Sequence, residues 1–175
     1  RNQTSFILYA GNEGPEYATV GLTIPLTCPD TWFFNPHPDI CPAAPAIVSP
    51  GAEQHFEHGL MLWVEGEDRI YVLFDDGNSP HWYAYVDEWD PGEPEYDPTI
   101  IPPTGFYQPV RGFGLVWREQ QGVRDRLGWA VDTESTYTTA VQRTSYARYN
   151  DTYIRAADMN VWRLITELRD RKSVV

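Results

Sequence analysis

Residues 109–130 read Pro-Val-Arg-Gly-Phe-Gly-Leu-Val-Trp-Arg-Glu-Gln-Gln-Gly-Val-Arg-Asp-Arg-Leu-Gly-Trp-Ala, and we place this stretch at the centre of the expected fold. Its apolar run, residues 113–118, has the composition of a buried strand. Residues 122–127 are expected to form one or two helical turns, because an apolar pair lies four positions apart and Gly128 can end a helix. The stretch contains no nucleophile paired with a base and no phosphate-binding loop, so we interpret it as a packing unit.

The composition predicts an all-β protein. A chain of 175 residues can bury a sizeable core in one domain or two small ones. It contains 7 Trp and 11 Tyr beside 13 Gly and 15 Pro, which favours short strands joined by many turns. We expect antiparallel hairpins in a small barrel or sandwich, with one or two short helical turns. Residues 1–51 would hold an N-terminal strand and a Pro-rich loop, and residues 52–175 a hairpin-repeat β domain, together forming one structural unit.

The charge argues against two classes of partner. The net charge is −12 and the pI is about 4.6, which argues against nucleic-acid binding and against docking on an anionic membrane surface. No apolar run reaches the length needed to span a bilayer, so no membrane insertion is expected.

Three features favour an extracellular or cell-surface location. The chain starts at Arg1, which leads us to expect a mature chain without its signal segment; a cleaved purification tag is the alternative. Cys28 and Cys41 flank a Pro-rich loop, so we predict one disulfide, with two free buried thiols as the alternative. Glycosylation sequons begin at Asn2 and Asn150.

Apolar runs punctuated by turn residues predict the strands. The expected strands cover residues 5–10, 17–26, 60–64, 69–74, 81–86, 136–146, 152–155 and 160–164. Residues 28–50 contain six prolines, a density that excludes a central strand there. Residues 87–105 are expected to form an acidic loop, and the tail from residue 166 a helical turn or a frayed strand.

A weak internal repeat places glycine, aliphatic residues and tryptophan in the same order at residues 54–63 and 113–117, with a degenerate copy at residues 160–163. Leu127-Gly128-Trp129-Ala130 followed by Glu134, with Gln54-x-Phe56-Glu57-x-Gly59-x-Met61-x-Trp63, resembles the LGFP-type repeat of bacterial cell-surface proteins. Residues 52–165 are also similar to extracellular bacterial modules that carry these hairpin and Arg-Gly-Phe-Gly-x-Val-Trp-Arg motifs. The resemblance implies a surface-exposed β module with structural rather than catalytic motifs.

No catalytic centre and no metal site are expected. The chain has no Gly-x-Ser-x-Gly elbow, Walker loop or dinucleotide fingerprint. His55 and His58 lie three apart in a segment that leads into a strand, where such positions point to opposite faces. Calcium at the acidic residues 87–97, or at the turn formed by Asp75, Asp76 and Asn78, is the alternative to a solvated acidic surface.

The tryptophans divide into two groups. Core packing is expected for Trp63, Trp82, Trp117, Trp129 and Trp162. Trp32 and Trp89 lie in Pro-rich loops, so they are the candidates for an exposed platform on which sugar rings stack.

The leading hypothesis is a structural subunit of a cell-surface filament, sheath or layer that associates with copies of itself. Its N-terminal strand, with Phe6, Ile7, Leu8 and Tyr9, must be paired to avoid aggregation. It pairs either within its own domain or by strand exchange into a neighbouring subunit. The alternative function is a module that binds carbohydrate or cell wall, and the third is a glycoside hydrolase-like enzyme.

Overall fold

The computed structural model describes residues 3–11, 17–25, 27–146 and 149–165. The strands are β1 (Gln3–Gly11), β2 (Tyr17–Pro25), β3 (Ile47–Phe56), β4 (Gly59–Val64), β5 (Arg69–Phe74), β6 (Trp82–Val86), β7 (Ser135–Arg143), β8 (Thr152–Arg155) and β9 (Val161–Leu164). The helices are α1 (Arg111–Glu119) and α2 (Val123–Leu127), and η1 (Glu65–Glu67) is a 3-10 turn. Leu26, at the end of the second expected strand, and the tail from residue 166 lie outside the described residues.

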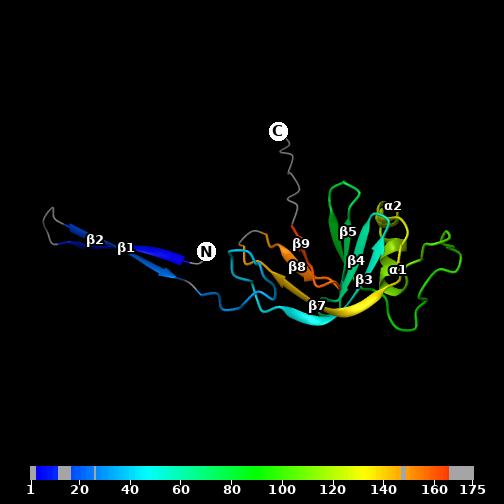
Figure 1. Ribbon diagram of the computed structural model, residues 1–175, viewed down its shortest axis with the longest axis horizontal. Helices are drawn as coiled ribbons and strands as arrows, with labels where there is room; N and C mark the ends of the chain where they lie inside the picture. Colours follow the sequence, from blue (N-terminus) through cyan, green and yellow to red (C-terminus); the bar gives the residue numbers. More distant parts are fainter. Residues whose placement is uncertain (1–2, 12–16, 26, 147–148, 166–175) are drawn as a thin grey trace.

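Seven strands form one antiparallel sheet in the order β6-β5-β4-β3-β7-β8-β9, which curls into a half-barrel. The two remaining strands, β1 and β2, form a separate hairpin that extends away from the half-barrel (Figure 1). The prediction of an all-β fold made of antiparallel hairpins with short helical segments is therefore confirmed.

The sheet carries an apolar cluster on each face. Successive side chains of β4 point to opposite faces of the sheet, and Met61 points to the face covered by α1 and α2. There it packs with Phe113 and Trp117 of α1. The neighbouring Leu62 belongs to the second cluster, inside the curl, with residues from β5, β7, β8 and β9. The helices therefore cover one face, while the other face closes on itself by curvature.

Residues 113–118 form part of helix α1, so the prediction of a strand there is wrong. Phe113, Val116 and Trp117 are buried on one side of the helix, at the i, i+3, i+4 spacing of a helical face. A short apolar run does not distinguish a buried strand from a buried helix, and packing on the sheet decided between them. Residues 122–127 were correctly expected to be helical, and Gly128 ends α2 with a φ of 72°.

The expected internal repeat is also wrong as a structural unit. Residues 59–63 form strand β4, whereas residues 113–117 form helix α1. The same order of glycine, aliphatic residues and tryptophan therefore adopts two different secondary structures, and the two segments do not stack as equivalent hairpins.

Strand β3 crosses the boundary that we expected at residue 51, and it lies between β4 and β7. The exclusion of a central strand from residues 28–50 is wrong for its last four residues. Pro50 is tolerated because it pairs with Thr138 of β7, while pairing with β4 begins only at Gly51. Proline has no backbone N–H to donate, and at position 50 only one neighbouring strand runs beside β3.

The Pro-rich loop before β3 is fixed at two points. The predicted disulfide between Cys28 and Cys41 is confirmed. Gln142 of β7 holds the loop from the sheet side: its amide oxygen accepts the Phe33 N–H at 3.1 Å, and its amide nitrogen donates to the carbonyls of Thr31 and Ala44 at 3.0 Å. The loop therefore covers the sheet beside β7.

Replacing Cys28 and Cys41 with serine is expected to lower the free energy of unfolding by about 3 kcal/mol, because the disulfide closes a loop of 13 residues. Urea denaturation of the variant and of the reduced native chain should give the same loss. A loss below about 1 kcal/mol would mean that the Gln142 contacts alone fix the loop.

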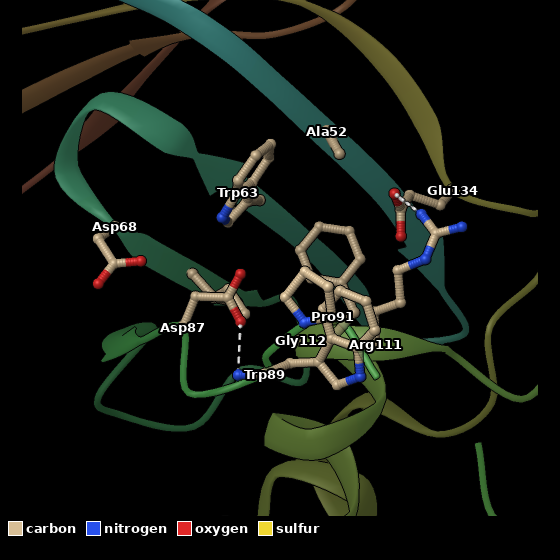
Figure 2. A pocket seen from close by; sticks show the side chains of 11 residues that line it. Ala52, Trp63, Asp68, Asp87, Trp89, Pro91, Arg111, Gly112 and Glu134 are labelled. Carbon is tan, nitrogen blue, oxygen red and sulfur yellow. Dashed lines mark hydrogen bonds and ion pairs between the residues drawn. The ribbon is translucent and has the colours of Figure 1, made fainter. Parts of the chain in front are cut away.

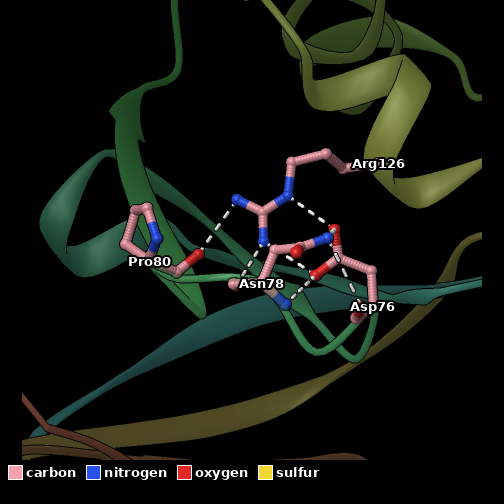
Figure 3. Close-up of polar contacts among 4 residues, drawn as sticks. All are labelled: Asp76, Asn78, Pro80 and Arg126. Atoms are coloured by element: carbon pink, nitrogen blue, oxygen red, sulfur yellow. Dashed lines mark hydrogen bonds and ion pairs between the residues drawn. The ribbon is translucent and has the colours of Figure 1, made fainter.

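Helix α2 is tied to the turn between β5 and β6 by Arg126 (Figure 3). The guanidinium donates to both carboxylate oxygens of Asp76, at 2.8 and 2.9 Å, and to the carbonyls of Asn78 and Pro80. It also lies 3.7 Å from the ring centroid of Phe74. These bonds hold the pKa of Asp76 well below its usual range, and they fix the turn against the helix.

Candidate functional site

The β1–β2 hairpin has one apolar face and one mainly polar face, which also carries Ile7. Directly paired residues of two antiparallel strands lie on the same face. The apolar face is formed by Phe6, Leu8, Val20, Leu22 and Ile24. On the opposite face Ser5 pairs with Thr23, and their hydroxyl oxygens lie 3.1 Å apart. The hairpin is thus amphipathic, like a strand pair that packs on a core.

The apolar face of the hairpin is open to solvent. Phe6 is 50% exposed, Leu8 58% and Val20 61%. The two strands pair only with each other among the described residues, and Figure 1 shows them as an arm beside the half-barrel. An isolated two-stranded hairpin is marginally stable in water, and a contiguous exposed apolar patch marks an interaction surface. This face is therefore a candidate docking surface.

The strands of the hairpin carry no Asp, Glu, Lys or Arg. This is notable in a chain with a net charge of −12. Charged side chains are the usual protection of exposed strands against association, and here that protection is missing. A partner can approach the hairpin without desolvating a charge.

All four residues of the expected self-assembly strand lie in β1, which pairs with β2 along its nine residues. Of the two expected alternatives, the structure presents pairing within the chain. Exchange of β1 alone would require these pairs to break. Phe6 and Leu8 lie on the apolar face and Ile7 on the other, while for Tyr9 the structure describes only the backbone, paired with Thr19.

The half-barrel has two free edges. Strand β6 pairs only with β5, and β9 only with β8, in the described part of the chain. The edges approach each other where the Trp82 indole N–H donates to the carbonyl of Ile165 at 2.8 Å. Exposed apolar side chains flank these edges, namely Val86, Trp162 and Ile165. In the described part of the chain the sheet therefore has two unpaired edges, which contact each other at Trp82 and Ile165 and lie next to apolar surface.

A cleft of about 330 Å³ lies where the N-terminal end of α1 meets the sheet (Figure 2). This volume is at the lower end of the range for small-molecule sites. Its apolar walls are Ala52, Trp63, Ile70, Trp89, Pro91 and Phe113. Its polar side chains are Asp68, Asp87, Arg111 and Glu134. The cleft thus combines aromatic rings with carboxylates and one guanidinium.

Arg111 is held loosely between two carboxylates. Its Nε lies 3.4 Å from Glu95 Oε1, and a terminal nitrogen lies 3.5 Å from Glu134 Oε1. Its backbone has a φ of 50°, in the left-handed region that non-glycine residues seldom adopt. Burial raises the pKa of Glu134, and Arg111 opposes this effect. The long contacts leave N–H groups of Arg111 free for a ligand.

Asp87 lies against the first turn of α1. Its Oδ1 accepts the backbone N–H of Trp89 at 3.3 Å, and a Cβ at position 112 would overlap that oxygen, so Gly112 permits the approach. Burial raises the pKa of Asp87, and the Trp89 amide opposes the rise. The carboxyl is therefore partly buried and has acceptor capacity to spare.

Two buried indole N–H groups beside the cleft, those of Trp63 and Trp89, find no hydrogen-bond acceptor among the described residues. The Trp63 indole favours the charged form of Asp87 without reaching hydrogen-bonding geometry. A buried donor without an acceptor costs about 1–3 kcal/mol.

The structure separates the two tryptophans expected as sugar platforms. Trp89 lines the cleft. Trp32 instead packs edge-on against Phe34 and Tyr153, and its indole N–H donates to the Ile40 carbonyl at 2.8 Å. Among the tryptophans expected in the core, Trp117 is fully buried, whereas Trp162 is 42% exposed, so that expectation is wrong for Trp162.

Sequence reasoning missed the cleft as a site. Its polar groups come from the η1–β5 turn, the loop after β6, the start of α1 and the segment before β7. No short motif joins these segments, so their proximity depends on the folded sheet. The one available signal was the expectation that Trp89 lies in a loop near carboxylates.

The remaining predicted sites are dispersed. Asn150 is exposed in a loop, and Asn2 lies outside the described residues, so glycosylation at both remains a prediction. Asp76 of the alternative calcium site is bonded to Arg126. His55 contacts Asp132 at 2.8 Å, and the described residues contain no cluster of three or more His, Cys, Asp or Glu side chains that could hold a metal ion.

Comparisons with protein-family models, with curated proteins and with solved structures found no match for this chain. Among the described residues, no helix has the length and apolar character needed to span a lipid bilayer. The class defined by the fold is thus a mostly β module with one disulfide, an amphipathic hairpin arm and an aromatic cleft.

Proposed function

We propose that this protein is a structural subunit that assembles with copies of itself through the β1–β2 hairpin. The observation that carries the proposal is the exposed, uncharged apolar face of the hairpin. Among the described residues its five large apolar side chains are 41–61% exposed. Burial of such a face contributes about 25 cal/mol for each Å² removed from water, so a partner surface would stabilise both the contact and the hairpin.

The partner surface we propose is the open side of the half-barrel in a second copy. Edge strands β6 and β9, whose outer sides are unpaired within the described residues, offer backbone groups to an incoming strand pair. The apolar side chains of Val86, Trp162 and Ile165 lie exposed beside these edges and complement an apolar hairpin face. Each subunit has a net charge of −12, so two subunits repel each other. The strands that enter the contact are uncharged, so this repulsion is not concentrated there.

This contact joins two different surfaces, so it is head-to-tail and propagates unless it closes into a ring. A filament, sheath or layer is the expected product. We place it outside the cell, and the Cys28–Cys41 disulfide supports this because disulfides persist in oxidising compartments. The function proposed is structural and not catalytic.

The test is a charge-pair substitution on each face of the hairpin. Phe6→Glu with Leu22→Lys replaces a cross-strand pair on the apolar face, and Ser5→Glu with Thr23→Lys replaces the adjacent pair on the polar face. Both variants add one negative and one positive charge in opposed positions, which favours the hairpin itself. Light scattering and electron microscopy of the full chain should show polymers for the native protein and the polar-face control, and monomers for the apolar-face variant.

Two results would contradict the proposal. One is polymerisation of the apolar-face variant at the native concentration. The other is a native chain that stays monomeric, or stops at a symmetric dimer, at every concentration tested. Addition of the apolar-face variant to native protein should also shorten the polymers, because a chain that can accept a hairpin but cannot donate one caps a head-to-tail assembly.

A further inference from the structure

The cleft beside α1 has no role in the proposed assembly, yet its composition is that of a ligand site. It is lined by three carboxylates, one guanidinium and three large aromatic residues. Figure 2 shows Asp68 and Asp87 toward one side of the cleft and Arg111 with Glu134 toward the other, with Trp63 and Trp89 between them. A ligand between these groups would meet hydrogen-bond acceptors and donors around an aromatic surface.

The chemistry of the lining selects a polyhydroxylated ring. Asp68 and Asp87 supply acceptors, while Arg111 supplies donors. Hydroxyl groups both donate and accept, so a single sugar ring can satisfy both kinds of group. The apolar face of the same ring can pack on an indole, which provides contact area with little loss of side-chain freedom.

The charge of the cleft lining narrows the class of ligand further. Three carboxylates against one guanidinium leave the lining negative, which opposes an acidic sugar such as a uronic acid. The same lining would attract a cation at Asp68 and Asp87, so tetramethylammonium is included in the test below as the cationic comparison. Among sugars, a neutral hexose or an N-acetylated hexose fits the lining.

We propose that the cleft binds one neutral sugar residue of a polysaccharide, stacked on Trp89 and hydrogen-bonded by Asp87, Arg111 and Glu134. The cleft binds the sugar without cleaving it. Glycosidases separate an acid from an ionised carboxylate by giving them opposite environments, whereas Asp87 and Glu134 are both half-buried and the pKa of each is raised by burial. The inference does not depend on self-assembly, since no residue of the hairpin lines the cleft.

The test is titration of the full chain with neutral oligosaccharides, monitored by calorimetry and tryptophan fluorescence. The probes are hexamers of cellulose, amylose, β-1,3-glucan, β-mannan and chitin, with hexagalacturonate as the acidic comparison. We expect saturable binding of at least one neutral probe and none of hexagalacturonate. Trp89→Ala should weaken that binding at least about tenfold, while the matched loop variant Trp32→Ala, whose ring packs on Tyr153, should leave it unchanged.

Several outcomes would overturn the proposal. These are no binding of any neutral hexamer at millimolar concentration, binding that survives Trp89→Ala, or stronger binding of hexagalacturonate or of tetramethylammonium than of the neutral probes. Release of new reducing ends from a bound hexamer would show that the cleft is the active site of a glycosidase and not a binding site alone. Asp87→Asn tests the role of the carboxylate while it retains the shape of the side chain. Circular dichroism of each variant shows whether lost binding reflects lost folding.

Discussion

Replacing Trp117 with alanine is expected to lower the free energy of unfolding by about 4 kcal/mol, because it removes the largest fully buried side chain. The indole is 0% exposed, packs beside Trp129 at 5.2 Å between ring centroids, and donates to the Gly128 carbonyl at 2.8 Å. Its removal opens a cavity between α1 and the sheet and leaves that carbonyl without its donor. For a chain of this length, the melting temperature should fall by about 12 °C.

Trp162→Ala is the matched control, since it deletes the same side chain from a position that is 42% exposed. Its cost should be below about 1 kcal/mol. Thermal unfolding followed by circular dichroism measures both variants. Equal losses would mean that Trp117 does not anchor α1, and Trp117→Phe, which retains most of the volume, should lie between the native chain and the alanine variant.

Arg143→Met is expected to lower the free energy of unfolding by about 2 kcal/mol at pH 7. Arg143 at the end of β7 donates to the Glu67 carboxylate of η1 and, at 2.9 Å, to the Tyr71 hydroxyl oxygen, and Tyr71 donates in turn to Glu67. Breaking a fully buried ion pair costs about 3–5 kcal/mol, and we reduce this value because the guanidinium is about one third exposed.

The effect should depend on pH. Burial raises the pKa of Glu67, but the bonds from Arg143 and Tyr71 outweigh it and hold this pKa below its ordinary value of 4.5. The folded state therefore binds the Glu67 proton more weakly than the unfolded state. The stabilisation is complete above about pH 4.5 and is lost as the pH falls through the folded-state pKa. The difference between native protein and Arg143→Met should consequently narrow from pH 5 to pH 3.

Urea unfolding at pH 7, 5, 4 and 3 measures this difference. Arg69→Met is the control, because Arg69 acts on Glu67 only through space; its cost should be below about 0.5 kcal/mol at pH 7. An Arg143→Met loss that is the same at pH 3 and pH 7 would show that packing of the arginine stem, and not its bond to Glu67, is responsible.

Local signals were sufficient where one segment decides its own structure. The disulfide of Cys28 and Cys41 follows from spacing, and the hairpin of β4 and β5 follows from two apolar runs around a polar turn. Local signals were insufficient at α1, because its short apolar run fits both the period of a strand and that of a helix. They were also insufficient at Pro50, because a proline is accepted in β3 only where one neighbouring strand is absent.

The sequence by itself determined that this chain folds into antiparallel hairpins with one disulfide, because strand alternation, turn residues and cysteine spacing act over a few residues. Only the tertiary structure decided that β1 joins β2 with its apolar face uncovered, and that Asp87, Arg111 and Glu134 meet at one cleft. Exposure of a face and convergence of distant side chains depend on how the sheet curls and where α1 packs, and these follow from the burial of the whole core rather than from any one segment.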